Sequence, residues 1–511
     1  MSTGARVVIE RLLAGGVDVC FANPGTSEMH FVAALDSAPQ MRPVLCLFEG
    51  VATGAADGYA RVTGRPAATL LHLGPGMANG LANLHNARRA FSPVVNVVGD
   101  HATYHKPLDA PLESDIEALA GWTHGSVHRP AFPADIATAV DDGIRSAESG
   151  RIATVVLPAD FSWGPAEAVV SAPESAVAEA ASGMHISAAA ELLRERGPQT
   201  LLLLGGAANT AEGLTAAARI ATATGARVLV ETFPARLARG RGVPHFDRLA
   251  YLGEAAVEQL SGTKDLVLVG AASPVTFFAY PGKPGDLVPP GAAVHELDPV
   301  GLGKLADQLG APPYSEPAPA PPALPTGPLN PVSWAQVIGA LLPDNAIISD
   351  EANTSGVFLP AATAGSAPHD VLTLTGGAIG QGLPVAVGAA VAAPERPVIA
   401  LQADGSALYT ISALWTMARE QLDVTVVILN NHSYAILQLE LQRVGTQATG
   451  ERSRSLLDLS RPDIDFVAIA EGFGVPASRA TTAEELAEQF GAALAESGPH
   501  LIDAAVPGWS G

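Results

Sequence analysis

Short runs of apolar residues, separated by stretches with helical periodicity, constrain the fold of this chain more than any other feature. Residues 200–206 (TLLLLGG) and 424–429 (VTVVIL) are apolar at nearly every position, so both faces of the strands that they form must be covered. Helices on both faces of a strand are typical of a parallel sheet, and we predict an α/β fold of doubly wound parallel sheets. The other strands are expected at 17–22, 42–48, 67–71, 94–98, 152–157, 226–230, 265–270, 293–298, 346–349, 398–403 and 501–505.

The length and two changes in composition predict three domains. A chain of 511 residues is too long for one compact core. Residues 171–184 are rich in Ala, Ser and Glu, and residues 311–331 are dominated by proline, as expected of connectors. We predict doubly wound domains at 1–170, 185–312 and 330–511.

Composition argues against several classes of protein. Hydrophobic residues make up 48% and charged residues 16%, which indicates a globular chain and not a disordered one. The net charge of −22 argues against a nucleic-acid partner, because affinity for phosphate backbones comes mainly from Lys and Arg. Residues 371–394 carry no charge but contain several glycines, so we expect a loop and a buried helix there and no membrane partner. Cys20 and Cys46 lie in apolar stretches and are expected to be buried and unpaired, which favours a cytoplasmic enzyme.

Polar residues follow two strands of the third predicted domain, 330–511. Asp404-Gly405-Ser406 comes after one strand, and Asn431, 27 positions beyond Asp404, comes after the next. Parallel strands end at the same edge of a sheet, where ligands of doubly wound folds bind. A carboxylate, an amide oxygen and a backbone carbonyl suit Mg²⁺ holding a diphosphate, and we expect Ser406 to begin a helix whose N-terminus faces phosphate. Two ordinary strand-end turns are the alternative, because Asp-Gly and Asn-Asn are common turn pairs.

Two residues of the first predicted domain, 1–170, also have side chains that could take part in catalysis. Glu49 follows the apolar strand 42–48, where its carboxyl group would lose water, a condition that favours a shared proton. A glutamate that caps the next helix is the alternative. His72 follows the strand 67–71, where either a proton-carrying histidine or a hydrogen-bonded polar residue fits.

The stretches ADGSALYTISALWT (403–416) and ILNNHSYAI (428–436) resemble the diphosphate-binding motif of thiamine-diphosphate (ThDP)-dependent enzymes. The likeness is greatest to benzoylformate decarboxylases and acetolactate synthases, and it covers essentially the whole chain. Ala403 replaces the first glycine of that motif but leaves the metal-binding aspartate in place. The resemblance implies that Mg²⁺ is bound by Asp404, Asn431 and the Ser433 carbonyl. It also implies that the diphosphate lies against Asn353, Thr354, Gly405, Ser406 and Tyr434.

The same resemblance gives roles to residues outside this motif. The segment FEGVATGAADGYAR, which contains Glu49, matches the one with the family's activating glutamate, which exchanges a proton with the cofactor's pyrimidine. The Gly377 carbonyl takes the cofactor's amino group, and Ile379 wedges the cofactor into a V shape. Thr26 stands where benzoylformate decarboxylase has a serine against the substrate carboxylate. His72 matches that family's active-site histidine and is our candidate proton shuttle.

Three departures from the family pattern leave the substrate open. The second histidine of the decarboxylase should lie near 272–282, where this chain has Phe277 and Phe278. Residues 74–76 (GPG) resemble acetolactate synthases instead. Glu440 lies on the helix that shapes the pocket and would repel an anionic substrate, unless it points away or pairs with Arg443.

The resemblance implies a ThDP- and Mg²⁺-dependent enzyme whose small-molecule substrate is a 2-oxo acid. The enzyme decarboxylates it without oxidation and then releases an aldehyde or joins two substrates. Acetolactate synthesis from two 2-oxo acids is the alternative. A catalytically idle ThDP-fold subunit is a second alternative, although such a subunit has no chemical need for Glu49, Asp404 and Asn431 together. We do not expect FAD, because the central predicted domain, 185–312, is short and shows no clear flavin motif. In this family the cofactor lies between subunits, which implies a homodimer or homotetramer with shared active sites.

Overall fold

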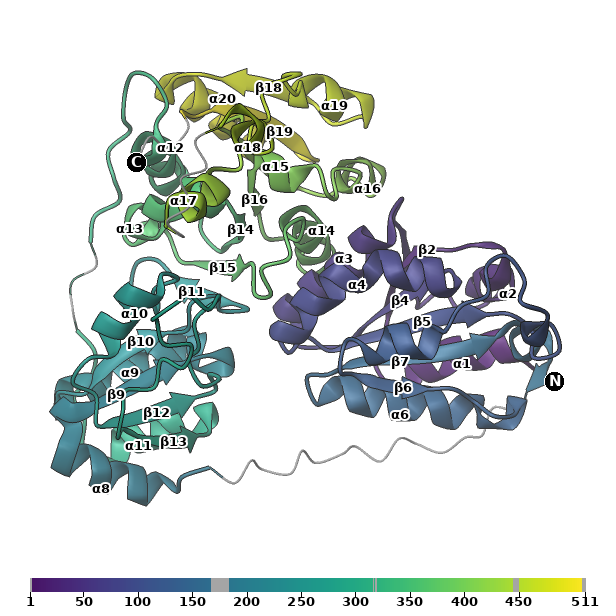
Figure 1. The fold of residues 1–511 in the computed structure, drawn as a ribbon, viewed down its shortest axis with the longest axis horizontal. Helices are drawn as coiled ribbons and strands as arrows, with labels where there is room; N and C mark the ends of the chain where they lie inside the picture. The colour runs from purple at the N-terminus through teal and green to yellow at the C-terminus, as the bar shows by residue number, and fades with distance from the viewer. Residues whose placement is uncertain (1, 167–182, 316, 318, 444–449, 508–511) are drawn as a thin grey trace.

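The computed structural model describes residues 2–166, 183–315, 317, 319–443 and 450–507, which form three units around parallel β-sheets (Figure 1). Clusters of buried apolar side chains lie on both faces of each sheet. The predicted α/β class with three doubly wound parallel sheets is therefore confirmed.

The N-terminal unit has a six-stranded, wholly parallel sheet. In order across the sheet its strands are β3 (Arg42–Leu45), β2 (Val19–Asn23), β4 (Ala67–Leu71), β5 (Val94–Asp100), β7 (Ile152–Pro158) and β6 (Ser126–His128). Its helices are α1 (Gly4–Ala14), α2 (Met29–Leu35), α3 (Glu49–Thr63), α4 (Leu73–Arg89), α5 (Ile116–Gly121), α6 (Ile136–Glu148) and α7 (Ala159–Trp163). Two short strands, β1 (Ser2–Thr3) and β8 (Pro165–Ala166), form a separate antiparallel pair. Alternate strand residues face opposite sides: Phe21 and Leu71 pack with α3 and α4, whereas Cys20 and Leu70 pack with α1 and α6.

The central unit is smaller and has a four-stranded parallel sheet. Its strands, in order across the sheet, are β10 (Arg227–Val230), β9 (Thr200–Leu204), β12 (Asp265–Val269) and β13 (Ala293–Leu297). Its helices are α8 (Ile186–Arg196), α9 (Ala211–Thr224), α10 (Gly253–Leu260) and α11 (Leu302–Gln308). A short strand between β10 and α10, β11 (Leu237–Arg239), leaves this unit and pairs with the sheet of the C-terminal unit.

The C-terminal unit has a seven-stranded sheet that is parallel except for β11. The order is β11, β15 (His369–Thr373), β14 (Ala346–Glu351), β16 (Val398–Ala403), β17 (Val424–Asn430), β19 (His500–Ala505) and β18 (Ala477–Ala480). Its helices are α12 (Pro331–Leu341), α13 (Leu359–Thr363), α14 (Gly382–Ala392), α15 (Asp404–Ala407), α16 (Ala413–Arg419), α17 (Ala435–Arg443), α18 (Glu451–Ser455), α19 (Phe466–Gly472) and α20 (Ala483–Ala495).

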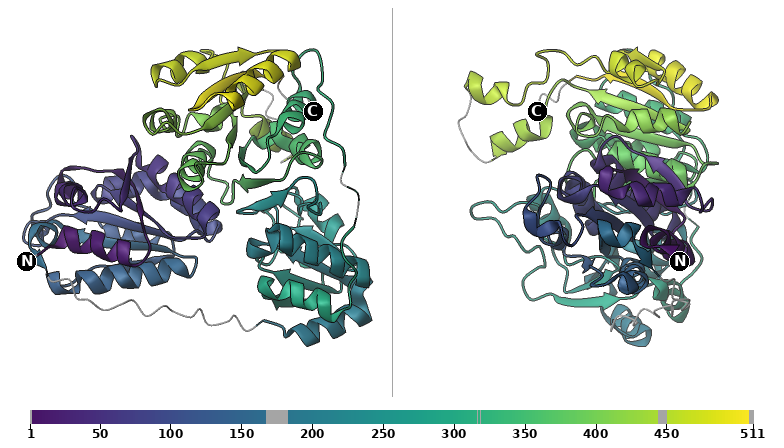
Figure 2. Two further views of the ribbon diagram at one scale, coloured as in Figure 1. Left: turned by 180° about the vertical axis from the view of Figure 1, so that it is seen from behind. Right: turned by 90° about the vertical axis from the view of Figure 1, so that its right-hand side faces the viewer.

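Helix α3 of the N-terminal unit packs directly on α14 of the C-terminal unit (Figures 1 and 2). Glycines permit this approach: a Cβ atom at Gly58 would overlap the Val385 carbonyl, and one at Gly388 would overlap the Ala55 carbonyl. The two helix backbones are therefore in contact, and a side chain at either glycine would push the units apart.

A buried ion pair on α3 strengthens this contact. The Arg61 guanidinium donates to both carboxylate oxygens of Asp57, at 2.8 and 2.6 Å, and neither side chain is more than 1% exposed. Arg61 also donates to the Thr373 carbonyl at 2.7 Å and to the Thr375 hydroxyl at 2.9 Å. One side chain of the N-terminal unit thus holds the end of β15 and the residues that follow it.

The apolar runs located most strands, with two kinds of error. The strand predicted at 42–48 is too long, since β3 ends at Leu45. Strands β1, β6, β8, β11, β15 and β18 were not predicted. Of the predicted linker 171–184, residues 171–182 lie outside the described residues, and the domain bounds 1–170, 185–312 and 330–511 remain a prediction. The described residues 311–315, 317 and 319–327 of the proline-rich connector contain neither helix nor strand.

The uncharged segment 371–394 supplies most of β15, a loop and the buried helix α14, as expected. Within the described ranges, no helix has both the length and the apolar character needed to cross a membrane.

Candidate active site

The predicted metal ligands lie together at the carboxyl ends of β16 and β17. The Asp404 carboxylate accepts hydrogen bonds from the backbone N–H groups of Gly405, at 2.8 Å, and Asn431, at 3.1 Å. The Asn431 side-chain oxygen accepts from the Ser433 N–H at 2.9 Å. Burial raises the pKa of Asp404, against the backbone hydrogen bonds that lower it. A bound cation would offset the cost of burying this charge.

The residues expected at the diphosphate surround this group. Asn353 and Thr354 begin a short 3₁₀ helix after β14, and the Asn353 amide donates to the Ser406 hydroxyl at 2.9 Å. A Cβ atom at Gly405 would overlap the Tyr434 ring, so only glycine fits there. The structure therefore brings the predicted metal and diphosphate residues to one edge of the sheet.

Two predictions of local structure are wrong at these sites. Helix α15 (four residues) begins at Asp404, because the backbone is extended up to Ala403. Ser406 is therefore inside the helix and does not begin it. Glu49 is not at a strand end either. It is the first residue of α3, because the chain leaves β3 at Leu45.

The glycine-rich loop, residues 374–381 between β15 and α14, carries the residues expected to hold the cofactor's pyrimidine. Gly377 has a φ of +74° and Gly380 a φ of +91°, backbone conformations that favour glycine. Ile379, between them, is half-buried. At the end of β14, the buried Glu351 carboxylate accepts from the N–H groups of Gly380, at 2.7 Å, and Gly382, at 2.6 Å. Burial raises the pKa of Glu351 to about 7.

Glu49 and His72 lie near each other in the N-terminal unit. The Glu49 carboxylate is buried and accepts a hydrogen bond from the Asn79 amide at 2.9 Å. A Cβ atom at Gly76 would lie 3.1 Å from Glu49 Oε1 and 3.5 Å from the Cβ of His72. Glycine at this position leaves space between the two side chains.

His72 is oriented by a buried acid. Its Nδ1 lies 2.8 Å from Glu28 Oε2, and the Gly25 N–H donates to the same oxygen at 2.9 Å. Burial raises the pKa of Glu28, and the charge of His72 lowers it. The Nε2 atom of His72 has no hydrogen-bond partner in the described part of the chain. Thr26 is exposed, two residues before Glu28.

The N-terminal group and the metal group belong to different units of the chain. No hydrogen bond or ion pair between described residues joins Thr26, Glu49 or His72 to the three predicted metal ligands. The two halves of the candidate site are therefore formed on separate units.

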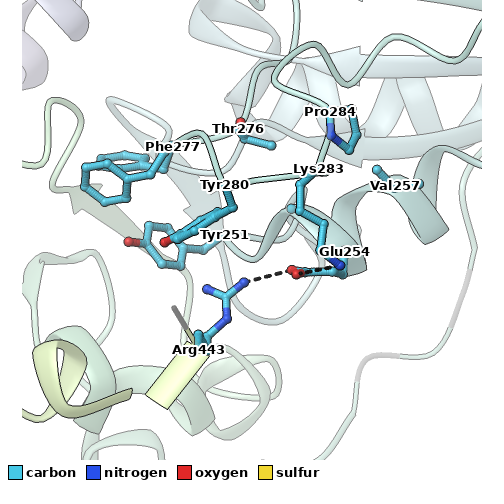
Figure 3. A pocket seen from close by; sticks show the side chains of 11 residues that line it. Tyr251, Glu254, Val257, Thr276, Phe277, Tyr280, Lys283, Pro284 and Arg443 are labelled. Carbon is cyan, nitrogen blue, oxygen red and sulfur yellow. Dashed lines mark hydrogen bonds and ion pairs between the residues drawn. The ribbon is translucent and has the colours of Figure 1, made fainter. Parts of the chain in front are cut away.

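An aromatic cluster occupies the place expected for the second histidine. The Phe277 ring lies 5.2 Å from Tyr251 and 5.3 Å from Phe278, centre to centre. The rings line a cavity of about 270 Å³, and Arg443 at the end of α17 also lines it (Figure 3). A Cβ atom at Gly377 would overlap the Phe277 ring, so the cluster adjoins the glycine-rich loop.

Glu440 is neutralised by its neighbours. Arg443 donates to Glu440 at 2.8 Å and to Glu254 at 2.8 Å, and the Tyr280 hydroxyl donates to Glu440 (Figure 3 shows the bond between Arg443 and Glu254). Lys283 lies 3.3 Å from Glu254. The sequence left open a pairing of Glu440 with Arg443, and this pairing is present.

The residues fit Mg²⁺ and a diphosphate. Among the described residues, no group of three or more His, Cys, Asp and Glu side chains could hold a metal by itself. The group at β16 and β17 offers one carboxylate, one amide oxygen and a backbone carbonyl, and Mg²⁺ commonly combines such a sparse set with phosphate oxygens.

Sequence reasoning missed three supporting residues. Glu351 gave a usable signal, an acid at the end of an apolar strand, but was not singled out. Glu28 was not singled out, because its partner His72 is 44 positions away in the sequence. Asn79 gave no signal, because asparagine is unremarkable on a helix surface.

Comparisons with known proteins identify the family. The family model described as the N-terminal TPP binding domain of thiamine pyrophosphate enzymes matches residues 2–121, and the C-terminal TPP binding domain matches 361–504. The chain is 60% identical to a Mycobacterium tuberculosis protein provisionally named acetolactate synthase large subunit IlvX, over 99% of both chains. It is 32% identical to benzoylformate decarboxylase of Pseudomonas aeruginosa, over 98% of both. It is also similar in structure to the ThDP-dependent 4-hydroxybenzoylformate decarboxylase of Rhodococcus jostii, with a TM-score of 0.85, 28% identity and full coverage of both chains. The chain belongs to the thiamine pyrophosphate enzymes.

Proposed function

We propose that this protein is a ThDP- and Mg²⁺-dependent enzyme that decarboxylates a 2-oxo acid without oxidation. The observation that carries the proposal is the group of oxygen ligands around Asp404 in a chain that also has a buried Glu49. The names of the relatives, a benzoylformate decarboxylase and a provisional acetolactate synthase, agree with 2-oxo acid chemistry.

Each half of the site has its own task. Asp404, Asn431 and the Ser433 carbonyl would hold Mg²⁺, with the diphosphate beside Asn353 and Ser406. Glu49, kept from water and held by Asn79, would exchange a proton with the pyrimidine ring. When bound, ThDP supplies a carbon nucleophile and a sink for the electron pair that remains when CO₂ leaves.

The pairing of His72 with Glu28 favours proton transfer to the product. Glu28 holds Nδ1 at 2.8 Å, which fixes the ring and leaves Nε2 to carry a proton to or from the substrate. Thr26, on the same turn as Glu28, would contact the substrate carboxylate. A positioned proton donor favours release of an aldehyde.

Acetolactate synthesis is the second candidate. It is favoured by the provisional name of the relative at 60% identity and by phenylalanines in place of the second histidine. Nothing favours an idle subunit, which would have no chemical need for Glu49, Asp404 and Asn431 together. FAD is not part of the proposal.

The assembly is also a proposal. The family resemblance, in which the cofactor lies between subunits, supports a homodimer or homotetramer with shared active sites. The buried, unpaired thiols of Cys20 and Cys46 suit a cytoplasmic location.

The test measures CO₂ release and product from pyruvate, 2-oxobutyrate, branched 2-oxo acids and benzoylformate, with protein stripped of ThDP and then reloaded. We expect release that requires both ThDP and Mg²⁺. A decarboxylase gives one CO₂ for each 2-oxo acid consumed, whereas an acetolactate synthase gives one for every two. Glu49→Gln should abolish most of the turnover, and the surface variant Glu10→Gln should not. Turnover without ThDP, or near-normal turnover of Glu49→Gln, contradicts the proposal.

A further inference from the structure

Side chains of α4 in the N-terminal unit hold the glycine-rich loop of the C-terminal unit. The Asn86 amide donates to the Ala378 carbonyl at 2.7 Å, and the Asn86 side-chain oxygen accepts from the Ala378 N–H at 3.2 Å. Beside it, His85 Nε2 lies 3.1 Å from the Gly376 carbonyl oxygen. The side chain of Asn86 thus pairs with Ala378 through two hydrogen bonds, as a neighbouring backbone would.

These two bonds fix the peptide planes on both sides of Ala378. The Ala378 N–H belongs to the same planar, trans peptide unit as the Gly377 carbonyl, so the two groups point in opposite directions. Asn86 holds the N–H and therefore directs the Gly377 carbonyl away from α4. The Ala378 carbonyl shares its peptide unit with the nitrogen of Ile379, so the same side chain also sets the position of Ile379.

Asn86 is itself held rigidly. It is fully buried, and its amide also donates to the Asn83 side-chain oxygen at 3.0 Å. Asn83 in turn donates to the carbonyls of Gly50, at 2.8 Å, and Gly380, at 3.3 Å. Rotation of the Asn86 amide by 180° would set N–H against N–H and oxygen against oxygen, so one orientation satisfies every partner. The network also connects the loop with Gly50, the neighbour of Glu49.

We propose that Asn86 is a positioning residue that directs the Gly377 carbonyl, and with it Ile379, for binding the aminopyrimidine of ThDP. The inference rests on the proposed function, in which Gly377 receives the amino group of the cofactor. Asn86 does not touch the cofactor in this proposal and acts only through the loop. Loss of its side chain should therefore affect the cofactor more than the rest of the fold.

The test compares Asn86→Ala with Asn96→Ala in the full-length protein. Asn96 is a matched control: it is fully buried in β5 of the same unit, where its side chain accepts from the Thr69 hydroxyl at 2.7 Å and donates to Thr154 at 3.3 Å. Both variants should lower the melting temperature of the ThDP-free protein. Only Asn86→Ala should weaken ThDP binding, measured by calorimetry with Mg²⁺ present, by about tenfold, as expected for one misdirected hydrogen bond.

Turnover gives a second readout. At saturating ThDP, kcat of Asn86→Ala should fall by about 100-fold, since small errors of position have effects of that size, while Asn96→Ala stays within about twofold of the unchanged protein. Wild-type ThDP affinity and kcat in Asn86→Ala, or equal losses in both variants, would overturn the proposal. If Asn86→Ala does not fold, His85→Ala removes the contact with Gly376 from the half-buried side of the loop and should weaken ThDP binding, and unchanged affinity there would count against the inference. Absence of ThDP binding by the unchanged protein would instead refute the proposed function.

Discussion

Replacement of Arg61 by methionine should destabilise the protein far more than loss of an ordinary ion pair. Arg61→Met keeps an unbranched side chain of similar length but removes the one cation that pairs with the fully buried Asp57 carboxylate in the described part of the chain. Among the described residues, Asp57 would retain a side-chain hydrogen bond only from the Ser92 hydroxyl. Removing one partner of a buried pair typically costs about 3 to 5 kcal/mol, because the remaining charge is left uncompensated. For a unit of this size the melting temperature should fall by roughly 6 to 20 °C.

Two further variants separate the buried charge from lost packing. Asp57→Asn combined with Arg61→Met leaves no buried charge and should recover part of the lost stability. Arg65→Met, four residues further on, removes a pair with Asp18 in which both side chains are about half exposed, and it should cost no more than about 1 kcal/mol. Scanning calorimetry at one pH and protein concentration provides the melting temperatures. A loss for Arg61→Met no larger than for Arg65→Met, or a double variant no more stable than the single one, would refute the reasoning.

Three further predictions concern single side chains. Burial raises the pKa of Glu351 from 4.5 to about 7, so this group makes the protein less stable as pH rises through that range. Glu351→Gln should remove about 3 kcal/mol of this pH dependence of the unfolding free energy. The measurement compares the melting temperatures of both proteins between pH 4.5 and 7.5. Asp404→Asn should weaken Mg²⁺-dependent ThDP binding at least about 100-fold in calorimetry, since groups that merely support a metal ligand are already worth about 10- to 100-fold; unchanged affinity would remove Asp404 from the metal site. Burial raises the pKa of Cys20 to about 12 and also raises that of Cys46, so neither thiol should react with a maleimide in the native protein at pH 8, whereas both should react after denaturation.

The fold was largely predictable because its strands are apolar on both faces. Strands such as β9 and β17 are apolar at nearly every position, a pattern that few other structures accommodate. Strand β15 was missed because it begins with His369 and Asp370, polar residues that become buried only through partners distant in sequence. Strand β3 was made too long because Cys46 and its neighbours are as apolar as the strand itself, although the backbone already turns towards α3.

The site was predictable where a short motif carries it, and less so where the support is distant. Asp404 and Asn431 lie at the ends of adjacent strands, as their positions in the sequence predict. Asn86 stands on a helix of the first unit and binds a peptide group 292 positions further along the chain. No local pattern marks such a residue, because its role arises only when two units pack together.

Strand β11 lies between β10 and α10 in the sequence but pairs with β15, so the C-terminal sheet depends on a segment that precedes it by more than 100 positions. Leu237–Arg239 covers the edge of β15 in an antiparallel register. A protein fragment that starts after the proline-rich connector would present β15 as an open edge, and open strand edges promote self-association. The C-terminal unit is therefore incomplete when expressed alone, and a fusion protein or chimaera that contains it would also need the β11 segment.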